Sequence, residues 1–248
     1  MGKKYRNPPL VEALCEFQFD PSQLWDLTIP GLFYERVYEE FPVKRQQAIV
    51  EMEFRAREAR LEQQVRAGVT RVQFLRHDET ALVQVGPDML AVNHLKPYPT
   101  WAHFRPMILK HLVLYQDLAK PKGLRRIGLR YINRVEVAGS VDELVRYLNL
   151  YPPQLKDLPQ SYESFLMRVE VPYGGGRDRL LLTTGSAQPE MPDMTAVILD
   201  LDYVMGQPGG VALTQVEQWL EEAHGRVELA FEACITPQAR ALFGEVER

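Results

Sequence analysis

The sequence LRRIGLRYINRVEV occupies Leu124–Val137, in the middle of the 248-residue chain. Side chains alternate between the two faces of a β-strand, so every second residue shares a face. One face of this stretch is apolar apart from Asn133 and can be buried: Ile127, Leu129, Tyr131, Val135 and Val137. The other face carries Arg126, Arg130 and Arg134, with Ile132 among them. We therefore predict a central strand with these three arginines, called the arginine ladder, on one side.

The chain follows one order of elements twice, namely strand, helix, several strands and helix, and the central strand opens the second round. Before it, apolar spacing predicts a strand over 11–19, a broken helix over about 22–41, strands over 48–56, 72–74, 81–85 and 90–92, and a helix over 100–119. After it, we predict a helix over 141–148, strands over 165–171, 179–185 and 196–204, and a helix over 214–235. Residues 56–67 are rich in Arg, Glu, Gln and Ala, so both an extended strand and a short helix stay open there.

This order predicts an α+β fold with two pseudo-repeated halves, 1–122 and 123–248, that form one compact unit. Many of the predicted strands are joined by short turns, which favours a mainly antiparallel sheet with its helices on one face. The arrangement resembles the helix-grip and TATA-binding-protein-like folds. The second face of such a sheet is then open to solvent or to a partner.

The composition limits the function classes. Hydrophobic residues make up 46% of the chain and charged residues 25%, which is typical of a globular protein. The net charge of −4 argues against a general binder of nucleic acid or of an acidic membrane. No apolar run is long enough for a membrane span, and the first residues lack the apolar run of a signal peptide. We predict a cytoplasmic protein that does not act at a membrane.

Three segments carry a resemblance to a known family: NPPLVEALCEF at residues 7–17, LRYINR at 129–134 and AHGRVELAFE at 223–232. They are similar to an uncharacterised, sporadically distributed family of bacterial and archaeal proteins of similar length. The resemblance spans nearly the whole chain and implies a prokaryotic, cytosolic protein. It implies no activity and no catalytic residues.

The open face of the predicted sheet mixes aliphatic and charged side chains. The aliphatic side chains that we place on it are Leu14, Ile49, Ile132, Leu166, Leu180, Leu182 and Ile198. The charged side chains are Arg126, Arg130, Arg134, Arg168, Glu16, Glu51, Glu53, Asp200 and Asp202. Such a mixture is typical of an interface, and a face partly covered by the protein's own loops is the equally supported alternative.

The arginine ladder has three interpretations. It pairs across strands with Asp200, Asp202 and Glu136, or it binds an anionic ligand, or it meets acidic groups of a protein partner. Pairing within the sheet is the favoured interpretation. Asp200 and Asp202 share a strand face, as carboxylates that hold a metal do, but a charged solvent-facing row is the more common reason for that spacing.

Other short patterns give weaker indications. Glu221 and His224 share a helix face, and we interpret this histidine as lying at a solvated helix edge. Gly174–Gly176 leads into a predicted strand, so we expect a hairpin turn and not a phosphate loop. Cys15 and Cys234 lie on apolar stripes, and we interpret both as core residues. His111 also lies on an apolar stripe and is predicted to be packed.

We therefore predict a non-enzymatic binding module that uses the open sheet face. Its predicted site residues are Leu14, Arg126, Arg130, Ile132, Arg134, Arg168, Asp200 and Asp202. The predicted partner is another protein or a second copy of the chain, with an anionic ligand or nucleic acid as alternatives and no cofactor. Two other functions stay open: a metal-dependent hydrolase or phosphodiesterase using Asp200 and Asp202, and a nucleic-acid-binding protein.

Overall fold

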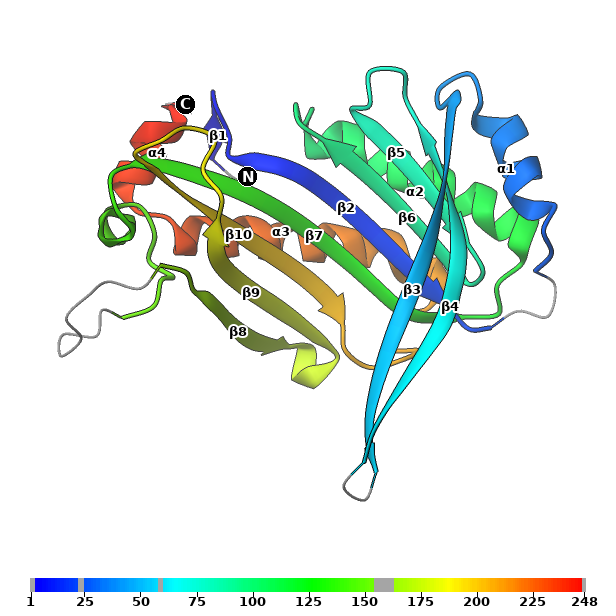
Figure 1. Cartoon of the computed structure of the whole chain (residues 1–248). Helices are drawn as coiled ribbons and strands as arrows, with labels where there is room; N and C mark the ends of the chain where they lie inside the picture. The colour runs from blue at the N-terminus through cyan, green and yellow to red at the C-terminus, as the bar shows by residue number, and fades with distance from the viewer. Residues whose placement is uncertain (1–2, 22–24, 58–59, 154–162, 247–248) are drawn as a thin grey trace.

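A computed structural model describes residues 3–21, 25–57, 60–153 and 163–246, with the backbone alone for 47–57 and 60–70. It confirms an α+β fold built on an antiparallel sheet of nine described strands, in the order β3-β4-β5-β6-β2-β7-β10-β9-β8. Helices α2 and α3 lie behind one face of this sheet (Figure 1). We call the face covered by these helices the inner face and the opposite one the outer face.

The main sheet contains β2 (Leu10–Phe19), β3 (Val43–Arg57), β4 (Arg60–Leu75), β5 (Ala81–Gly86), β6 (Met89–Leu95), β7 (Leu124–Ala138), β8 (Leu166–Tyr173), β9 (Asp178–Ala187) and β10 (Met194–Met205). The α-helices are α1 (Ile29–Val37), α2 (Trp101–Ala119), α3 (Val216–Cys234) and α4 (Pro237–Phe243). Short 3-10 turns are η1 (Val141–Arg146), η2 (Gly174–Gly176) and η3 (Leu213–Gln215), and β1 (Lys4–Tyr5) pairs with β11 (Glu245–Val246).

The predicted central strand is β7, which pairs with β2 on one side and with β10 on the other. Its apolar side chains are buried on the inner face, as predicted. Asn133, the one polar residue among them, is also buried, and its amide donates hydrogen bonds to the carbonyl oxygens of Leu199 and Tyr131. The carbonyl acceptors explain why a polar side chain is tolerated at this depth.

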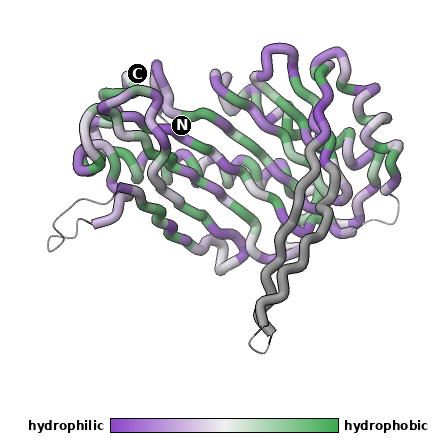
Figure 2. The backbone as a smooth tube through the Cα atoms, in the orientation of Figure 1, coloured by the Kyte–Doolittle hydropathy of each residue, from purple (hydrophilic) through white to green (hydrophobic). Residues whose placement is uncertain are grey.

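Two long helices close the core over the inner face. The buried stripe of α3 includes Leu220, Ala223 and Val227, and Tyr115 of α2 stacks on Phe19 of β2. Apolar and polar residues alternate along the strands in Figure 2, as expected for a sheet that is buried on one side. His111, Cys15 and Cys234 are buried, which confirms their interpretation as packed residues.

Several boundaries differ from the prediction. The ambiguous residues 56–67 are strand wherever the structure describes them, because β3 and β4 pair with each other along their length. Helix α3 begins at Val216, two residues later than predicted, after the turn η3. The predicted helix over 141–148 is the 3-10 turn η1. The short helix α4 and the β1–β11 pair were not predicted.

The two halves follow a comparable topology. In the first half, β2 lies beside β6, the last strand before α2, and in the second half β7 lies beside β10, the last strand before α3. The pair β2–β7 joins the two sets of strands into one sheet. The internal repeat itself stays a prediction. No helix in the described residues is both long and apolar enough to cross a membrane.

Candidate functional site

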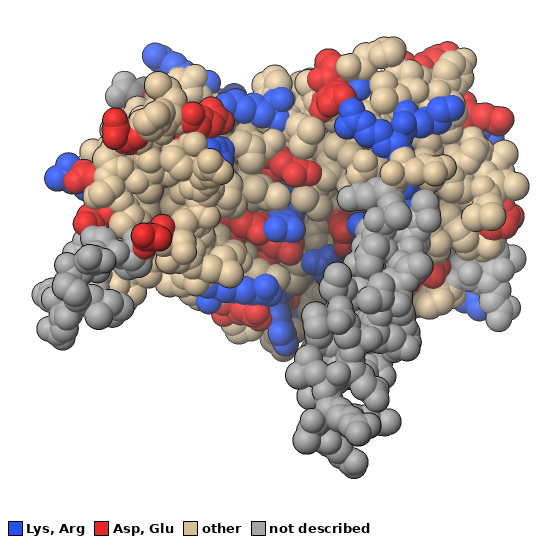
Figure 3. Space-filling model, in the orientation of Figure 1, with Lys and Arg blue, Asp and Glu red and all other residues tan. Residues whose placement is uncertain are grey.

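The predicted site residues meet on the outer face, where β2, β7 and β10 lie side by side. Arg130 of β7 is opposite Leu14 of β2 and Asp202 of β10, and Ile132 is opposite Asp200. Figure 3 shows acidic and basic side chains gathered in the middle of the molecule, in the orientation of Figure 1. The backbone registers therefore bring together residues that are more than 180 positions apart in the sequence.

The arginine ladder is paired with carboxylates. Arg130 donates two hydrogen bonds to Asp200, from Nε to Oδ1 at 2.8 Å and from Nη2 to Oδ2 at 2.6 Å. Arg126 donates to Glu16 at 3.1 Å and to Asp202 at 3.3 Å, which links three strands. Pairing within the sheet, the favoured interpretation of the ladder, is thus present.

Arg134 completes the ladder in a different way from the one predicted. It pairs with Glu136 on its own strand and not across strands, and its Nη2 donates to the carbonyl oxygen of Gln188 at 2.6 Å. Glu190 lies 3.8 Å from its Nε. This end of β7 is therefore held to the segment between β9 and β10.

Carboxylates outnumber arginines at the centre of the outer face. Glu12, Glu16, Asp200 and Asp202 surround Arg126 and Arg130, and they are the acidic partners that these arginines have in the sheet. The bidentate bond to Asp200 occupies one edge of the Arg130 guanidinium. An added anion would meet repulsion from the remaining carboxylates, so the geometry disfavours the ladder as a site for an anionic ligand.

Asp202 is the carboxyl of this group whose ionised form is disfavoured by its surroundings. Burial raises the pKa of its carboxyl to about 6, Arg126 and Arg130 act in the opposite direction, and the charges of Asp200 and Glu16 add to the increase. The two arginines do not outweigh burial and acidic repulsion together. A cation placed near Asp202 would therefore stabilise its charged form.

A row of amides extends the polar surface across the first half of the sheet. Gln73 donates to Gln84 at 3.1 Å, Gln84 donates to Asn93 at 3.1 Å, and Asn93 donates to Glu12 at 2.6 Å. The row crosses β4, β5, β6 and β2 and ends beside the carboxylates. This row was not predicted from the sequence, although each of its residues occupies an outward position on its strand.

Aliphatic side chains separate the charged ones, with one correction to the prediction. Leu14, Ile132 and Ile198 are half-buried on the outer face, and Leu166 is 80% exposed. Leu180 and Leu182 were assigned to this face wrongly. Their partners in β10 are Tyr203 and Leu201, which are buried on the inner face.

The cause of this error is a strand phase shifted by one residue, which exchanges the two faces. Leu181 and Thr183 occupy the outer face of β9 instead. Ile49, Glu51 and Glu53, also placed on this face, lie outside the residues whose side chains the structure describes.

Arg168 lies at the border of the outer face and not with the ladder. It is on β8, opposite Thr183 of β9, and it is exposed. Its guanidinium lies 3.1 Å from the Glu170 carboxylate on the same strand. Arg168 therefore belongs to the edge of the sheet.

His224 is not at a solvated helix edge, as the sequence suggested. Its ring stacks on Trp101 with 4.3 Å between ring centroids, where α3 meets α2. Burial lowers the pKa of His224 to about 4, so the imidazole is neutral at pH 7. Glu221 accepts a hydrogen bond from the Trp101 indole and pairs with Arg105 of α2. Both residues connect the two helices.

Gly174–Gly176 forms the turn η2 between β8 and β9, which confirms the predicted hairpin. All three glycines have positive φ, a backbone conformation that favours glycine. The turn leads into a strand and not into a helix N-terminus, so it lacks the geometry of a phosphate loop.

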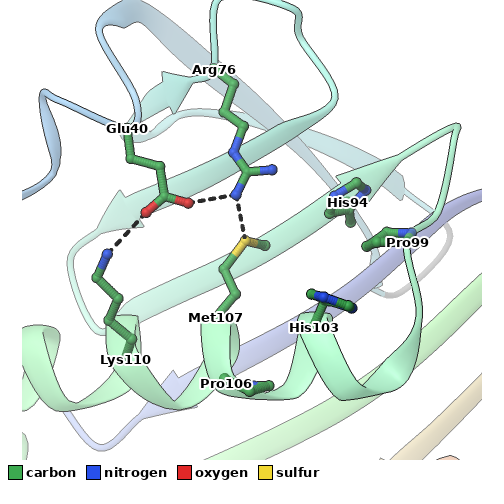
Figure 4. Close-up of a pocket in the computed structure, with 8 residues that line it drawn as sticks. All are labelled: Glu40, Arg76, His94, Pro99, His103, Pro106, Met107 and Lys110. Carbon is green, nitrogen blue, oxygen red and sulfur yellow. Dashed lines mark hydrogen bonds and ion pairs between the residues drawn. The ribbon is translucent and has the colours of Figure 1, made fainter.

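A cavity of about 340 Å³ lies on the helix side, between α2 and the ends of β4 and β6. Glu40 accepts hydrogen bonds from Arg76 at 2.5 Å and from Lys110 at 2.9 Å, as Figure 4 shows. His94 and His103 line the other side. This cavity was not predictable from the sequence, because its lining comes from four segments that no spacing rule connects.

Metal ligands do not gather in the part of the chain that the structure describes: it contains no group of three His, Cys, Asp or Glu side chains suited to an ion. Asp200 and Asp202 are both hydrogen bonded to arginines. A comparison of the chain with protein-family models and with curated proteins finds no match.

Proposed function

We propose that this protein is a non-enzymatic binding module. Carboxylates on its outer sheet face bind basic side chains of a partner protein. The excess of carboxylates over arginines around Asp202 is the observation that carries this proposal. Half-buried aliphatic side chains, Leu14, Ile132 and Ile198, lie among the charges and supply apolar contact area. The combination suits a partner that presents lysine or arginine next to apolar residues.

The chemistry of Asp202 explains why the partner is basic. Its pKa is raised to about 6, so its negative charge is only partly compensated in the free protein. A lysine or arginine that approaches Asp202 and Glu16 adds the missing positive charge and excludes water from the pairs. The interaction energy between these charges is larger there than at a fully solvated site, because the effective dielectric constant is lower.

Fluorescence anisotropy with two labelled peptides tests this proposal. We expect a peptide of alternating lysine and leucine to bind and a peptide of alternating glutamate and leucine not to bind. The double variant Asp200→Asn, Asp202→Asn is expected to weaken binding of the lysine peptide about tenfold or more, which corresponds to about 1.4 kcal/mol. The affinity is also expected to fall with increasing salt.

The matched control is Glu79→Gln, which removes an exposed carboxylate paired with Arg45, away from the outer-face cluster. This variant should bind the lysine peptide like the wild type. Equal affinity for both peptides, or unchanged binding by the double aspartate variant, would refute the proposal.

The two other functions suggested by the sequence have less support. A metal-dependent hydrolase would need Asp200 and Asp202 to exchange arginine partners for an ion. A nucleic-acid-binding protein would bring phosphates against the same carboxylates that make the centre of the face acidic. Neither function has a specific observation in its favour.

A second candidate function, binding of a small anion, is favoured by the cavity next to α2. Arg76 uses Nη2 to bind Glu40, and a guanidinium has further N–H donors on Nε and Nη1. Lys110 adds a second cation at the same opening. His94 donates from Nδ1 to the carbonyl oxygen of Leu95, so its Nε2 is an acceptor when the ring is neutral. These groups suit an oxyanion that also carries a hydroxyl group.

Calorimetric titration with inorganic phosphate and with citrate tests the cavity. We expect binding of at least one of them, reduced about tenfold or more in Arg76→Gln because a charge-assisted hydrogen bond is removed. Arg45→Gln is the control, since this exposed arginine pairs with Glu79 and does not line the cavity. Absence of heat with both anions, or an equal loss in both variants, would contradict this function.

A further inference from the structure

Strand β8 ends the main sheet, and no described strand pairs with its second edge. In Figure 1 it forms the border of the sheet, beyond β9. Two of its apolar side chains are exposed: Leu166 at 80% and Val169 at 39%. An edge strand with exposed backbone donors and acceptors can pair with a further strand.

The phase of the β8 backbone decides which groups are available at this edge. The Ser186 N–H donates to the Phe165 carbonyl oxygen at 3.0 Å, so the pair 165/186 is hydrogen bonded. Because hydrogen-bonded and non-hydrogen-bonded positions alternate, odd-numbered residues of β8 direct their N–H and C=O groups to β9. The even-numbered residues, Leu166, Arg168, Glu170 and Pro172, direct theirs to the second edge, where no described strand pairs and Pro172 offers only its carbonyl.

The sequence of β8 is self-complementary when it is paired with an antiparallel copy centred on Val169. In this register Arg168 of one copy lies opposite Glu170 of the other, and the reverse pair follows by symmetry. Leu166 lies opposite Pro172, so its N–H meets the proline carbonyl. Val169 lies opposite itself, and both exposed apolar side chains gain a neighbour.

We propose that β8 pairs with β8 of a second copy of this chain in the register centred on Val169. The charges select this register over its neighbours. A two-fold centred on Arg168 would place two arginines opposite each other, and one centred on Glu170 would place two glutamates opposite each other. Like charges in directly opposed positions are destabilising.

Charged residues and proline at an edge usually prevent strand pairing. In β8 the two charges have opposite signs and flank Val169 symmetrically. They therefore disfavour pairing with any strand that does not carry the complementary order of charges. Pro172 lies at the outer end of the pairing and leaves the four central donors and acceptors of Arg168 and Glu170 intact. The same features that prevent general association therefore permit self-association.

This pairing goes beyond the proposed binding of a basic partner and does not depend on it. A two-fold axis perpendicular to the sheet keeps the outer faces of both copies on the same side. The carboxylate-rich centres remain uncovered in the dimer. If the lysine peptide does not bind, the proposed dimer is not contradicted. If the chain does not dimerise, the proposed binding of a basic partner is not contradicted.

Sedimentation equilibrium over a concentration series tests the charge register. We expect a concentration-dependent dimer for the wild type. Arg168→Glu and Glu170→Arg each turn both symmetric pairs into like charges, so each is expected to weaken dimerisation about tenfold or more. The double variant Arg168→Glu, Glu170→Arg restores opposite charges and is expected to recover the dimer. A wild type that stays monomeric, or single variants that dimerise like it, would overturn the proposal.

A cysteine at the symmetry centre provides a second measurement. Residues opposed at a non-hydrogen-bonded position have Cα atoms about 4.5 Å apart, which is within the range that a disulfide spans. Val169→Cys is therefore expected to form a cross-linked dimer rapidly under mild oxidation. Cys15 and Cys234 are buried and do not compete.

The matched control is Val113→Cys, which places a thiol at an exposed position of α2. It is expected to cross-link slowly, by random collision. Equal rates for the two cysteine variants would show that Val169 has no preferred partner and would overturn the proposal. Thermal melting of each variant shows whether the fold is kept. We expect it to be kept, because each substituted side chain is exposed.

Discussion

At the scale of single residues, Asp202 is the described carboxyl whose pKa burial raises clearly. Its pKa is raised from 3.8 to about 6, so the folded state binds a proton more tightly than the unfolded state. The cost of the ionised carboxylate is therefore absent below about pH 4, grows between pH 4 and 6, and is complete at pH 7.

Asp202→Asn is expected to stabilise the protein at pH 7 to 8 by about 1 to 3 kcal/mol and to have little effect below pH 4. The asparagine keeps an acceptor for Arg126 and removes the charge. Urea unfolding at several pH values measures the difference, with Glu79→Gln as the exposed control. A destabilised variant at pH 8 would show that its bond to Arg126 outweighs the cost of burial.

Residue pairing was only partly predictable from the sequence. Alternation places Arg130 and Asp202 on one face, and they do lie opposite each other. The bidentate bond of Arg130 nevertheless goes to Asp200, two residues away from Asp202 along β10, because a long side chain reaches diagonal neighbours as well. The choice between them depends on side-chain geometry that alternation does not contain.

At the scale of elements, the amphipathic spacing of α3 determines how the second half closes. Leu220 is fully buried against the sheet, whereas Leu229 on the same helix is 65% exposed. Leu220→Ala is expected to lower the free energy of unfolding by about 2 to 5 kcal/mol, because it leaves a cavity in the core. Leu229→Ala should change it by less than about 0.5 kcal/mol. Urea unfolding compares the two, and equal effects would contradict the assigned helix face.

Elements with a strong apolar period were predictable, and elements set by distant pairing were not. The spacing of β2, β7, α2 and α3 specifies both their type and their buried face. Residues 56–67 have helix-favouring side chains, and only pairing between β3 and β4 makes the described part of them strand. In β9, runs of leucine and threonine fit both phases, which explains the exchanged faces of Leu180 and Leu182.

At the scale of the whole molecule, the outer face could be predicted and the cavity could not. The face follows from alternation along strands that become neighbours, so its charged composition is visible in the sequence. The cavity needs the positions of Glu40, Arg76, His94 and α2 in space, which only the folded chain provides. The proposed contact between copies likewise needs the backbone phase of β8, although its charge order is present in the sequence.

The pairing of β2 with β7 in the main sheet has a consequence for any chain that is divided between the two halves. The backbone hydrogen bonds between β2 and β7 satisfy donors and acceptors of both halves, so each half covers a strand edge of the other. A separated half would expose the unpaired edge of a long strand and would be prone to aggregate by pairing with strands of other chains. Natural or engineered chains that are divided between β2 and β7 must either keep both pieces associated or supply another segment that covers the exposed strand edge.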